Sequence, residues 1–140
     1  MFSSKKDDWT TPKWLYDELN KEFNFTVDLC ASNENALCPK YYTLENDGMK
    51  AKLNGERVFC NPPYGRKSTE KWVKKCAECN AELVVMLLPA RTDTKAFHNY
   101  IYHKAEIRFL KGRLKFGEGK NSAPFPSMIV VFKNEQNKHD

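Results

Sequence analysis

Apolar residues near the start of the chain recur with the spacing of one helical face. Leu15, Leu19 and Phe23 lie four positions apart, which predicts an amphipathic helix over residues 12–23. The residues before it are typical of a helix start, because the hydroxyl of Thr11 precedes a proline at the first helical position. We therefore expect Thr11 to cap this helix.

Two later stretches have the same helical character. Trp72 and Cys76 fall on one side of a helix predicted over residues 68–80. A third apolar stripe follows Asp93, whose carboxylate is expected to cap the helix that carries it.

Short apolar runs alternate with these helices. The run LVVMLL has no polar position, which is typical of a strand that is buried on both faces. Together the runs predict five strands, over residues 25–28, 57–60, 83–88, 107–110 and 128–132.

This alternation predicts an α/β fold, with a mostly parallel sheet, helices on both of its faces and an antiparallel edge formed by the last two strands. Ligands of such sheets bind beyond the carboxyl ends of the strands. Asp28 and Asn61 stand at two of these ends. They are the first candidates for a functional site.

The length and composition are those of a single globular domain: 140 residues, 41% hydrophobic and 29% charged. We expect this domain over residues 9–132, between a flexible N-terminal segment (1–8) and a polar tail (133–140). The sequence shows neither an apolar run long enough for a bilayer nor a secretory signal. We therefore expect a cytoplasmic protein with no membrane contact.

The net charge of +5 is concentrated in two places. Residues 65–75 hold five basic residues and one acidic residue, and residues 104–120 hold six basic and two acidic residues. Two basic patches on a small domain indicate a polyanion such as nucleic acid. Ordinary solvated faces are the alternative, and the charge pattern alone leaves it open.

The five cysteines are odd in number, which argues against a disulfide framework in a chain without export signals. Cys76 and Cys79 have the spacing of zinc ligands, but no second pair accompanies them. We expect reduced, partly buried thiols and no metal.

The tetrapeptide NPPY at residues 61–64 carries the clearest chemistry. Two prolines fix the backbone and remove two donors, so the amide oxygen of Asn61 and the carbonyl of Pro62 can be aimed at one point. Two acceptors beside the ring of Tyr64 suit a planar base with an exocyclic amine. A Pro-Pro turn that merely ends a strand is the alternative.

NPPY resembles the catalytic motif of S-adenosylmethionine-dependent amino methyltransferases, above all DNA adenine-N6 methyltransferases. The resemblance to the phage-type Dam-like family covers about residues 9–132 and rests on six segments in order: WTTP (9–12), DLCAS (28–32), DG (47–48), NPPY (61–64), LPARTDT (88–94) and GRLKF (112–116). It implies a Rossmann-like class I methyltransferase core and a site-specific enzyme that methylates N6 of an adenine flipped out of double-stranded DNA.

The resemblance implies a role for each matching residue. The catalytic residues are Asn61, Pro62, Pro63 and Tyr64. The residues implied to bind S-adenosylmethionine are Thr11, Pro12, Asp28, Cys30, Ala31, Asp47 and Asn61. Thr11 and Asp47 have plainer alternative roles, as a helix cap and as part of a turn.

The adenine and its DNA need further contacts. The expected residues are Tyr64, Arg66, Lys67, Arg91, Lys111, Arg113, Lys115, Phe116 and Phe125. Phe116 or Phe125 would take the second face of the adenine, unless both belong to the core. Arg91 would contact phosphate or, more simply, pair with Asp93.

The chain also departs from the family pattern. It lacks a GxG after the first strand. Because the domain expected over residues 9–132 fills most of the sequence, we expect no separate recognition domain. Loops, or a second subunit in a homodimer, would then read the DNA. Three activities stay open: methylation of DNA adenine, methylation of an RNA adenine or a protein glutamine, and nucleic-acid binding without turnover.

Overall fold

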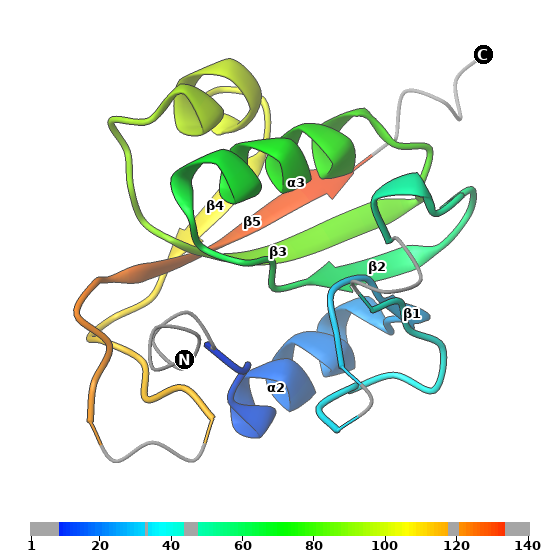
Figure 1. The fold of residues 1–140 in the computed structure, drawn as a ribbon, viewed down its shortest axis with the longest axis horizontal. Coiled ribbons are helices and arrows are strands. Elements are labelled where there is room, and N and C mark those ends of the chain that lie inside the picture. The colour runs from blue at the N-terminus through cyan, green and yellow to red at the C-terminus, as the bar shows by residue number, and fades with distance from the viewer. Residues whose placement is uncertain (1–8, 33, 44–47, 118–120, 134–140) are drawn as a thin grey trace.

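The computed structural model describes residues 9–32, 34–43, 48–117 and 121–133. The two predicted terminal segments therefore lie outside the described residues, apart from Lys133. Within the described part, five strands form one sheet with helices on both of its faces (Figure 1). The expected α/β class is confirmed.

Four elements make up the first half of the chain: α2 (Lys13–Phe23), β1 (Val27–Asp28), the short 3-10 helix η1 (Gly48–Lys50) and β2 (Arg57–Cys60). Five follow in the second half: α3 (Arg66–Glu78), β3 (Leu83–Pro89), the π-helix η2 (Phe97–Ile101), β4 (Glu106–Phe109) and β5 (Ser127–Lys133). Every predicted strand is present, with ends that move by no more than two residues.

The strand order is β1-β2-β3-β5-β4, with β1, β2 and β3 parallel and β5 antiparallel to both of its neighbours. The predicted antiparallel edge is thus formed by β4. Its partner β5, however, is inserted between β3 and β4, so the antiparallel part of the sheet reaches its centre. Hydrophobic runs predict that strands exist, but they carry no information on their order.

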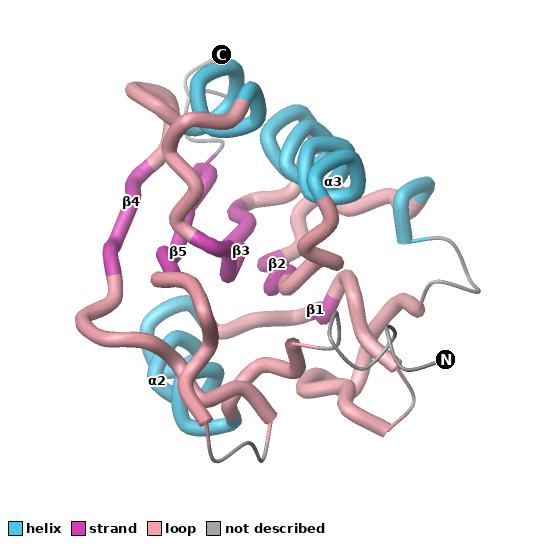
Figure 2. Tube along the Cα trace, turned by 60° about the vertical axis from the view of Figure 1, so that its left-hand side comes forward, coloured by secondary structure: helices cyan, strands magenta, loops and turns pink. Residues whose placement is uncertain are grey.

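Helices α3 and η2 cover one face of the sheet and α2 covers the other (Figures 1 and 2), and each face has its own core. Alternate residues of β3 point to opposite faces: Val84 and Met86 pack with α3 and η2, whereas Val85 and Leu87 pack with α2 and the loop 110–126. This alternation is the expected period of a strand, and the absence of polar positions in β3 follows from it.

Two predicted caps are wrong. Pro12, not Thr11, occupies the cap position of α2, with no side-chain cap. At the third helix, the hydroxyl of Thr94 rather than the carboxylate of Asp93 accepts a hydrogen bond from the amide of Phe97 (3.2 Å). At the other end of α2, Asn24 terminates the helix in the left-handed conformation (φ 52°).

Candidate active site

The carboxyl ends of β1 and β2 lie side by side and bring the two first candidates together. Asp28 pairs in register with Phe59 of β2, and the amide of Leu29 donates to the Phe59 carbonyl at 2.9 Å. Asn61 follows β2 directly. Residues far apart in the sequence therefore meet at one edge of the sheet, as the parallel topology predicts.

Asn61 is held by three hydrogen bonds. Its Nδ2 donates to the backbone carbonyl of Trp9 (2.6 Å) and to Oγ1 of Thr11 (2.9 Å). Its Oδ1 accepts from the hydroxyl of Tyr64 at 2.5 Å. The segment before α2, to which the family resemblance gives a role in the donor site, thus also contacts the catalytic motif. Trp9 belongs to the WTTP motif, but no pattern in the sequence marks its backbone carbonyl as part of the site.

Tyr64 is buried, with 5% of its surface exposed. Its hydroxyl also lies 3.1 Å from the Leu87 carbonyl, and burial raises its pKa well above the ordinary value, so the hydroxyl stays protonated. The ring packs edge-on against Phe116 and Phe125, with centroids 6.1 and 5.7 Å away. In this conformation Tyr64 presents no open face to a base.

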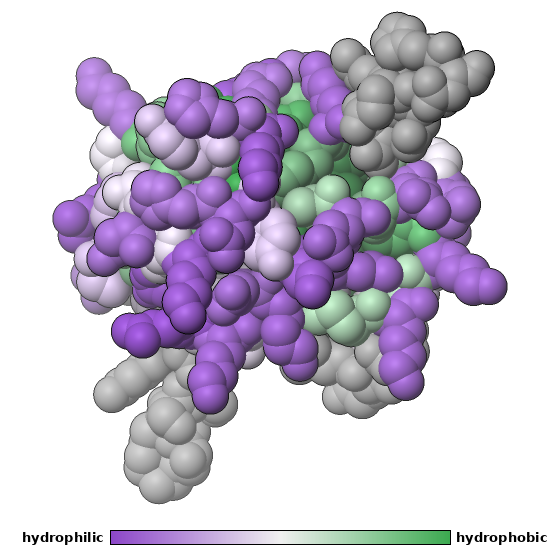
Figure 3. Space-filling view, turned by 90° about the horizontal axis from the view of Figure 1, so that it is seen from above, coloured by the Kyte–Doolittle hydropathy of each residue, from purple (hydrophilic) through white to green (hydrophobic). Residues whose placement is uncertain are grey.

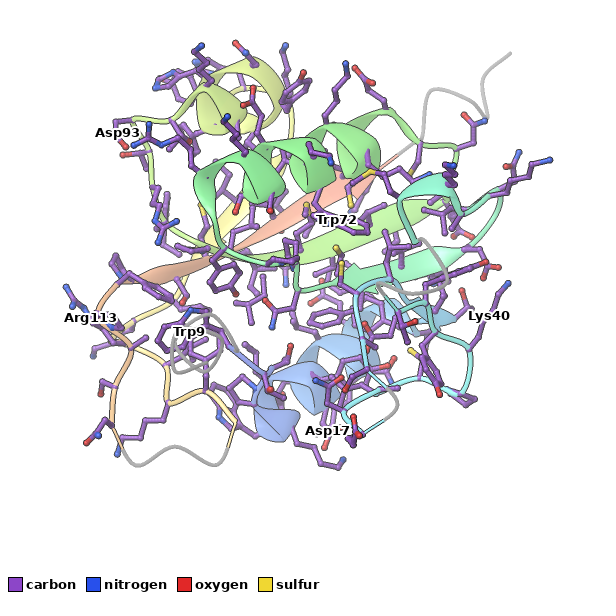
Figure 4. All side chains as sticks on the ribbon, viewed as in Figure 1. Trp9, Asp17, Lys40, Trp72, Asp93 and Arg113 are labelled. Carbon is purple, nitrogen blue, oxygen red and sulfur yellow. The ribbon has the colours of Figure 1, made fainter. Side chains whose placement is uncertain are left out.

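Tyr64 belongs to an aromatic cluster, whose other members are Trp9, Phe116 and Phe125. Trp9 packs edge-on against Phe116 (5.4 Å) and Phe125 (5.2 Å), and the amide of Gly117 donates to the carbonyl of Thr10. Figure 4 shows Trp9 beside the loop that carries Arg113. Phe116 is buried and Phe125 is half-buried, so Phe125 is the more accessible candidate for the second face of an adenine.

Asp28 is a buried carboxylate, with 3% of its surface exposed. The amide of Leu37 donates to Oδ2 at 3.1 Å, whereas Oδ1 has no hydrogen-bond partner in the described part of the chain. Burial raises the pKa of this carboxyl to about 6. A buried oxygen without a partner is costly, and a ligand that donates a hydrogen bond to Oδ1 would remove that cost.

Other residues expected to bind the donor are close in sequence to Asp28 or to Thr11, which contacts Asn61. Pro12 is buried beside Thr11, Cys30 is half-buried, and the amide of Ala31 donates to the Tyr42 carbonyl (2.9 Å). Asp47 lies outside the described residues. Among the described residues, no group of three His, Cys, Asp or Glu side chains is placed to hold a metal ion.

Cys60 lies between the thiols of Cys30 and Cys76 and is fully buried. Burial and the two neighbouring thiols raise the pKa of the Cys60 thiol well above its ordinary value. A protonated thiol is a poor nucleophile, so the fold does not activate this cysteine even though it precedes Asn61.

A cavity of about 770 Å³ lies between α3 and the segment 88–101. Asn61 does not line it. Its floor is apolar, and the charged side chains at its rim are Arg66, Lys67, Glu70, Arg91, Asp93 and Lys95. Hydrophilic side chains cover most of the surface on this side of the molecule (Figure 3).

Arg91 lines this cavity and also contacts the catalytic motif. Its Nη1 donates to the Tyr64 carbonyl at 2.9 Å, and its guanidinium lies 5.7 Å from the centre of the Phe125 ring. The expected pairing of Arg91 with Asp93 is wrong, since no such ion pair forms within the described ranges. Lys95, which also lines the cavity, was missed because a single lysine in a predicted helix carries no signal.

The second basic stretch is only partly available. Lys111, Arg113 and Lys115 are exposed on the loop 110–126. Arg108, in contrast, forms a bidentate pair with Glu22 (2.7 Å for both bonds) and is also bonded to Glu106. Arg108 therefore links β4 to α2 and adds little to a binding surface.

Comparison with known proteins adds to this geometry. A family model described as DNA N-6-adenine-methyltransferase (Dam) matches residues 1–139. The chain belongs to this family. The resemblance seen in the motifs is confirmed, and with it the enzyme class, a DNA adenine-N6 methyltransferase.

Two relatives carry the same description. The DNA N-6-adenine-methyltransferase of Haemophilus phage HP1 is 30% identical over 139 residues, covering 92% of this chain and 80% of that protein. The DNA N-6-adenine-methyltransferase of Escherichia phage T1 is 32% identical over 113 residues, which are 78% of this chain and 47% of that protein.

The solved structures that are similar to this chain include the crystal structure of 23S rRNA methyltransferase ErmE. It covers 84% of this chain and 47% of that one, with a TM-score of 0.43 and 17% sequence identity. No helix in the described part of this chain is long and apolar enough to cross a membrane.

Proposed function

We propose that this methyltransferase uses S-adenosylmethionine to methylate N6 of an adenine flipped out of double-stranded DNA. The observation that carries this proposal is the oriented amide of Asn61 at the carboxyl end of β2. Its two Nδ2 contacts leave Oδ1 as the atom that can accept from an amine. Action in a bacterial or phage-infected cytoplasm is part of the proposal.

The Asn61 oxygen and the Pro62 carbonyl would accept the two hydrogens of the exocyclic amine. This holds the nitrogen in one orientation and favours its lone pair for attack, so positioning and electrostatics supply most of the catalysis. Tyr64 would have to move before it could stack on the base, because its ring is buried against Phe116 and Phe125 and its hydroxyl already uses one lone pair of the Asn61 oxygen. The arriving amine replaces one hydrogen bond with another, and the tyrosine ring becomes available to stack on the base.

The residues at the end of β1 fit the proposed donor. Oδ1 of Asp28, which has no partner among the described residues, can accept a hydrogen bond from an ammonium group. Asp28 is the last residue of β1 and pairs with Phe59 of β2, two residues before Asn61. S-adenosylmethionine, when bound, supplies a methyl group on a sulfonium, an electrophile with a good leaving group. The chain itself therefore has to bind the donor and the adenine, orient them and exclude water. The proposed reaction needs neither a metal nor a nucleophilic side chain.

The DNA would lie across the carboxyl edge of the sheet. Arg66, Lys67 and Arg91, which line the cavity, would contact backbone phosphates on one side of the catalytic motif. Lys111, Arg113 and Lys115, which are exposed, would contact phosphates on the other side. Phosphate contacts position a duplex without reading its sequence, so base recognition falls to the loops or to a second subunit of a homodimer.

A comparison of substrates tests the proposal. Donor carrying a labelled methyl group is incubated with unmethylated duplex DNA, a duplex RNA of the same sequence and a glutamine-containing protein mixture. We expect label in DNA alone, recovered as N6-methyldeoxyadenosine after digestion. Label in RNA or protein but not in DNA would contradict the proposal, and label in none of them would favour a binding module.

A further inference from the structure

The Asn61 amide can be oriented in only one way by its surroundings. A backbone carbonyl only accepts hydrogen bonds, so the atom 2.6 Å from the Trp9 carbonyl oxygen must be the NH2 group. The other side of the amide then faces the Tyr64 hydroxyl, which donates to Oδ1. Turning the amide over would set its oxygen against the Trp9 carbonyl oxygen, with no hydrogen between them.

We infer that Thr11 and the Trp9 carbonyl are positioning groups for the methyl-transfer reaction: they hold the NH2 of Asn61 so that its oxygen always faces the substrate amine. This inference rests on the proposed function, since it assigns the substrate contact to Oδ1. Neither group touches the substrate in this scheme. Both act through Asn61.

Thr11 is free for this role because it does not cap α2. Pro12 occupies the cap position, and the Thr11 side chain is buried, with its Oγ1 at 2.9 Å from Asn61 Nδ2. The amide thus uses both of its hydrogens, one on each acceptor. With only one acceptor, the Asn61 amide could rotate about its side-chain bonds. Its oxygen would then hold the substrate amine less well in the orientation needed for attack.

Trp9 is fixed by contacts of its own. Its ring packs edge-on against Phe116 and Phe125, and the next residue accepts a backbone hydrogen bond from Gly117. Phe116, Gly117 and Phe125 therefore fix the segment whose Trp9 carbonyl orients Asn61. Lys111, Arg113 and Lys115, which are proposed to contact DNA, lie in the same segment of the chain (110–126) as these three residues. The segment that is proposed to bind DNA is therefore also the one that fixes the Asn61 amide.

A paired substitution at Thr11 tests the inference. Thr11→Val keeps the shape and removes the acceptor, whereas Thr11→Ser keeps the hydroxyl. We expect Thr11→Val to lower kcat by about tenfold, because one hydrogen bond is worth about that much in rate, with the KM for S-adenosylmethionine unchanged. Thr11→Ser should recover most of kcat. A raised KM for the donor at unchanged kcat would overturn the inference and make Thr11 a donor contact.

Asn61→Asp supplies a second test that a purely structural role would not pass. An ionised carboxylate would place an oxygen against the Trp9 carbonyl, whereas the protonated acid can still donate to it. We therefore expect the kcat of Asn61→Asp to fall as pH rises from about 5 to 8, a range over which a repelled carboxyl is expected to ionise. The wild-type kcat is measured over the same range.

A pH-independent Asn61→Asp with wild-type kcat would overturn the inference, because the NH2 group would then have no role. The circular dichroism spectrum of each variant is recorded first, so that loss of fold is not mistaken for loss of orientation. If the wild-type protein does not methylate DNA, the proposed function fails, and that result is seen before any variant is measured.

Discussion

Tyr64 donates its hydroxyl hydrogen to the oxygen that the substrate amine is proposed to use. Tyr64→Phe removes this competition. We expect the KM for DNA to fall about fivefold, the equivalent of about 1 kcal/mol for one hydrogen bond, while the free energy of unfolding falls by a similar amount. Steady-state kinetics and urea denaturation measure the two effects. An unchanged or raised KM for DNA would show that the hydroxyl does not block the acceptor.

We expect Asp28 to make the stability of the protein depend on pH in an unusual direction. Burial raises the carboxyl pKa from 3.8 to about 6, so between pH 4 and 6 the folded state binds more protons than the unfolded state. The free energy of unfolding should therefore rise as the pH falls from about 6.5 to 4, by up to about 3 kcal/mol from this group. Asp28→Asn should remove that rise, as measured by urea denaturation at each pH.

The same substitution tests the donor site. Because a neutral amide no longer attracts an ammonium group, Asp28→Asn should weaken S-adenosylmethionine binding by about tenfold, measured by calorimetry at pH 7.5. Wild-type affinity should itself decline as Asp28 is protonated below about pH 6. Equal donor affinity in both proteins across this range would remove Asp28 from the donor site.

At the scale of elements, η1 packs against the end of β1 without room for a side chain. A Cβ on Gly48 would lie 2.7 Å from the Leu29 carbonyl oxygen and 3.3 Å from the Trp72 ring. Gly48→Ala should therefore lower the melting temperature by several degrees, the equivalent of about 1–3 kcal/mol. Gly65→Ala is the matched control, because its Cβ meets nothing closer than 4.0 Å. Equal melting temperatures for the two variants would contradict this packing.

The elements themselves were largely predictable from the sequence. Apolar periodicity located α2, α3 and the strands, because burial against one face imposes it. The caps at Thr11 and Asp93 were wrong, since a side-chain oxygen near a helix start has several partners within reach and tertiary contacts choose among them. The insertion of β5 beside β3 could not be predicted, because it depends on pairing between distant segments.

The candidate site was likewise predictable in part from the sequence. NPPY and the residue types at the strand ends are visible in the sequence, and the parallel topology brings Asp28 and Asn61 to one edge. The bonds from Asn61 to Trp9 and Thr11 join residues at opposite ends of the first half of the chain. No local pattern encodes such contacts, and the folded structure was needed to find them.

At the scale of the whole molecule, the charge distribution predicts how DNA binding responds to salt. The combined change of Lys111, Arg113 and Lys115 to glutamine should reduce the slope of log K against log salt by about 0.9 for each phosphate that the loop no longer neutralises, up to about 2.7. Lys21→Gln is the control, because Lys21 is paired with Glu18 on α2. Fluorescence anisotropy with a labelled duplex measures both slopes. Equal slopes would mean that the loop does not contact the DNA backbone.

The most direct test of the central claim is single-turnover methylation of a duplex by the wild-type protein and by Asn61→Ala, with donor and DNA both saturating. The account predicts N6-methyldeoxyadenosine from the wild-type protein and a rate about 100-fold or more lower in Asn61→Ala, since that variant has no oriented hydrogen-bond acceptor at the reacting nitrogen. Because donor and DNA are both saturating, the measured rate reports the chemical step and not a change in binding. A variant that methylates adenine at the wild-type rate would contradict the account.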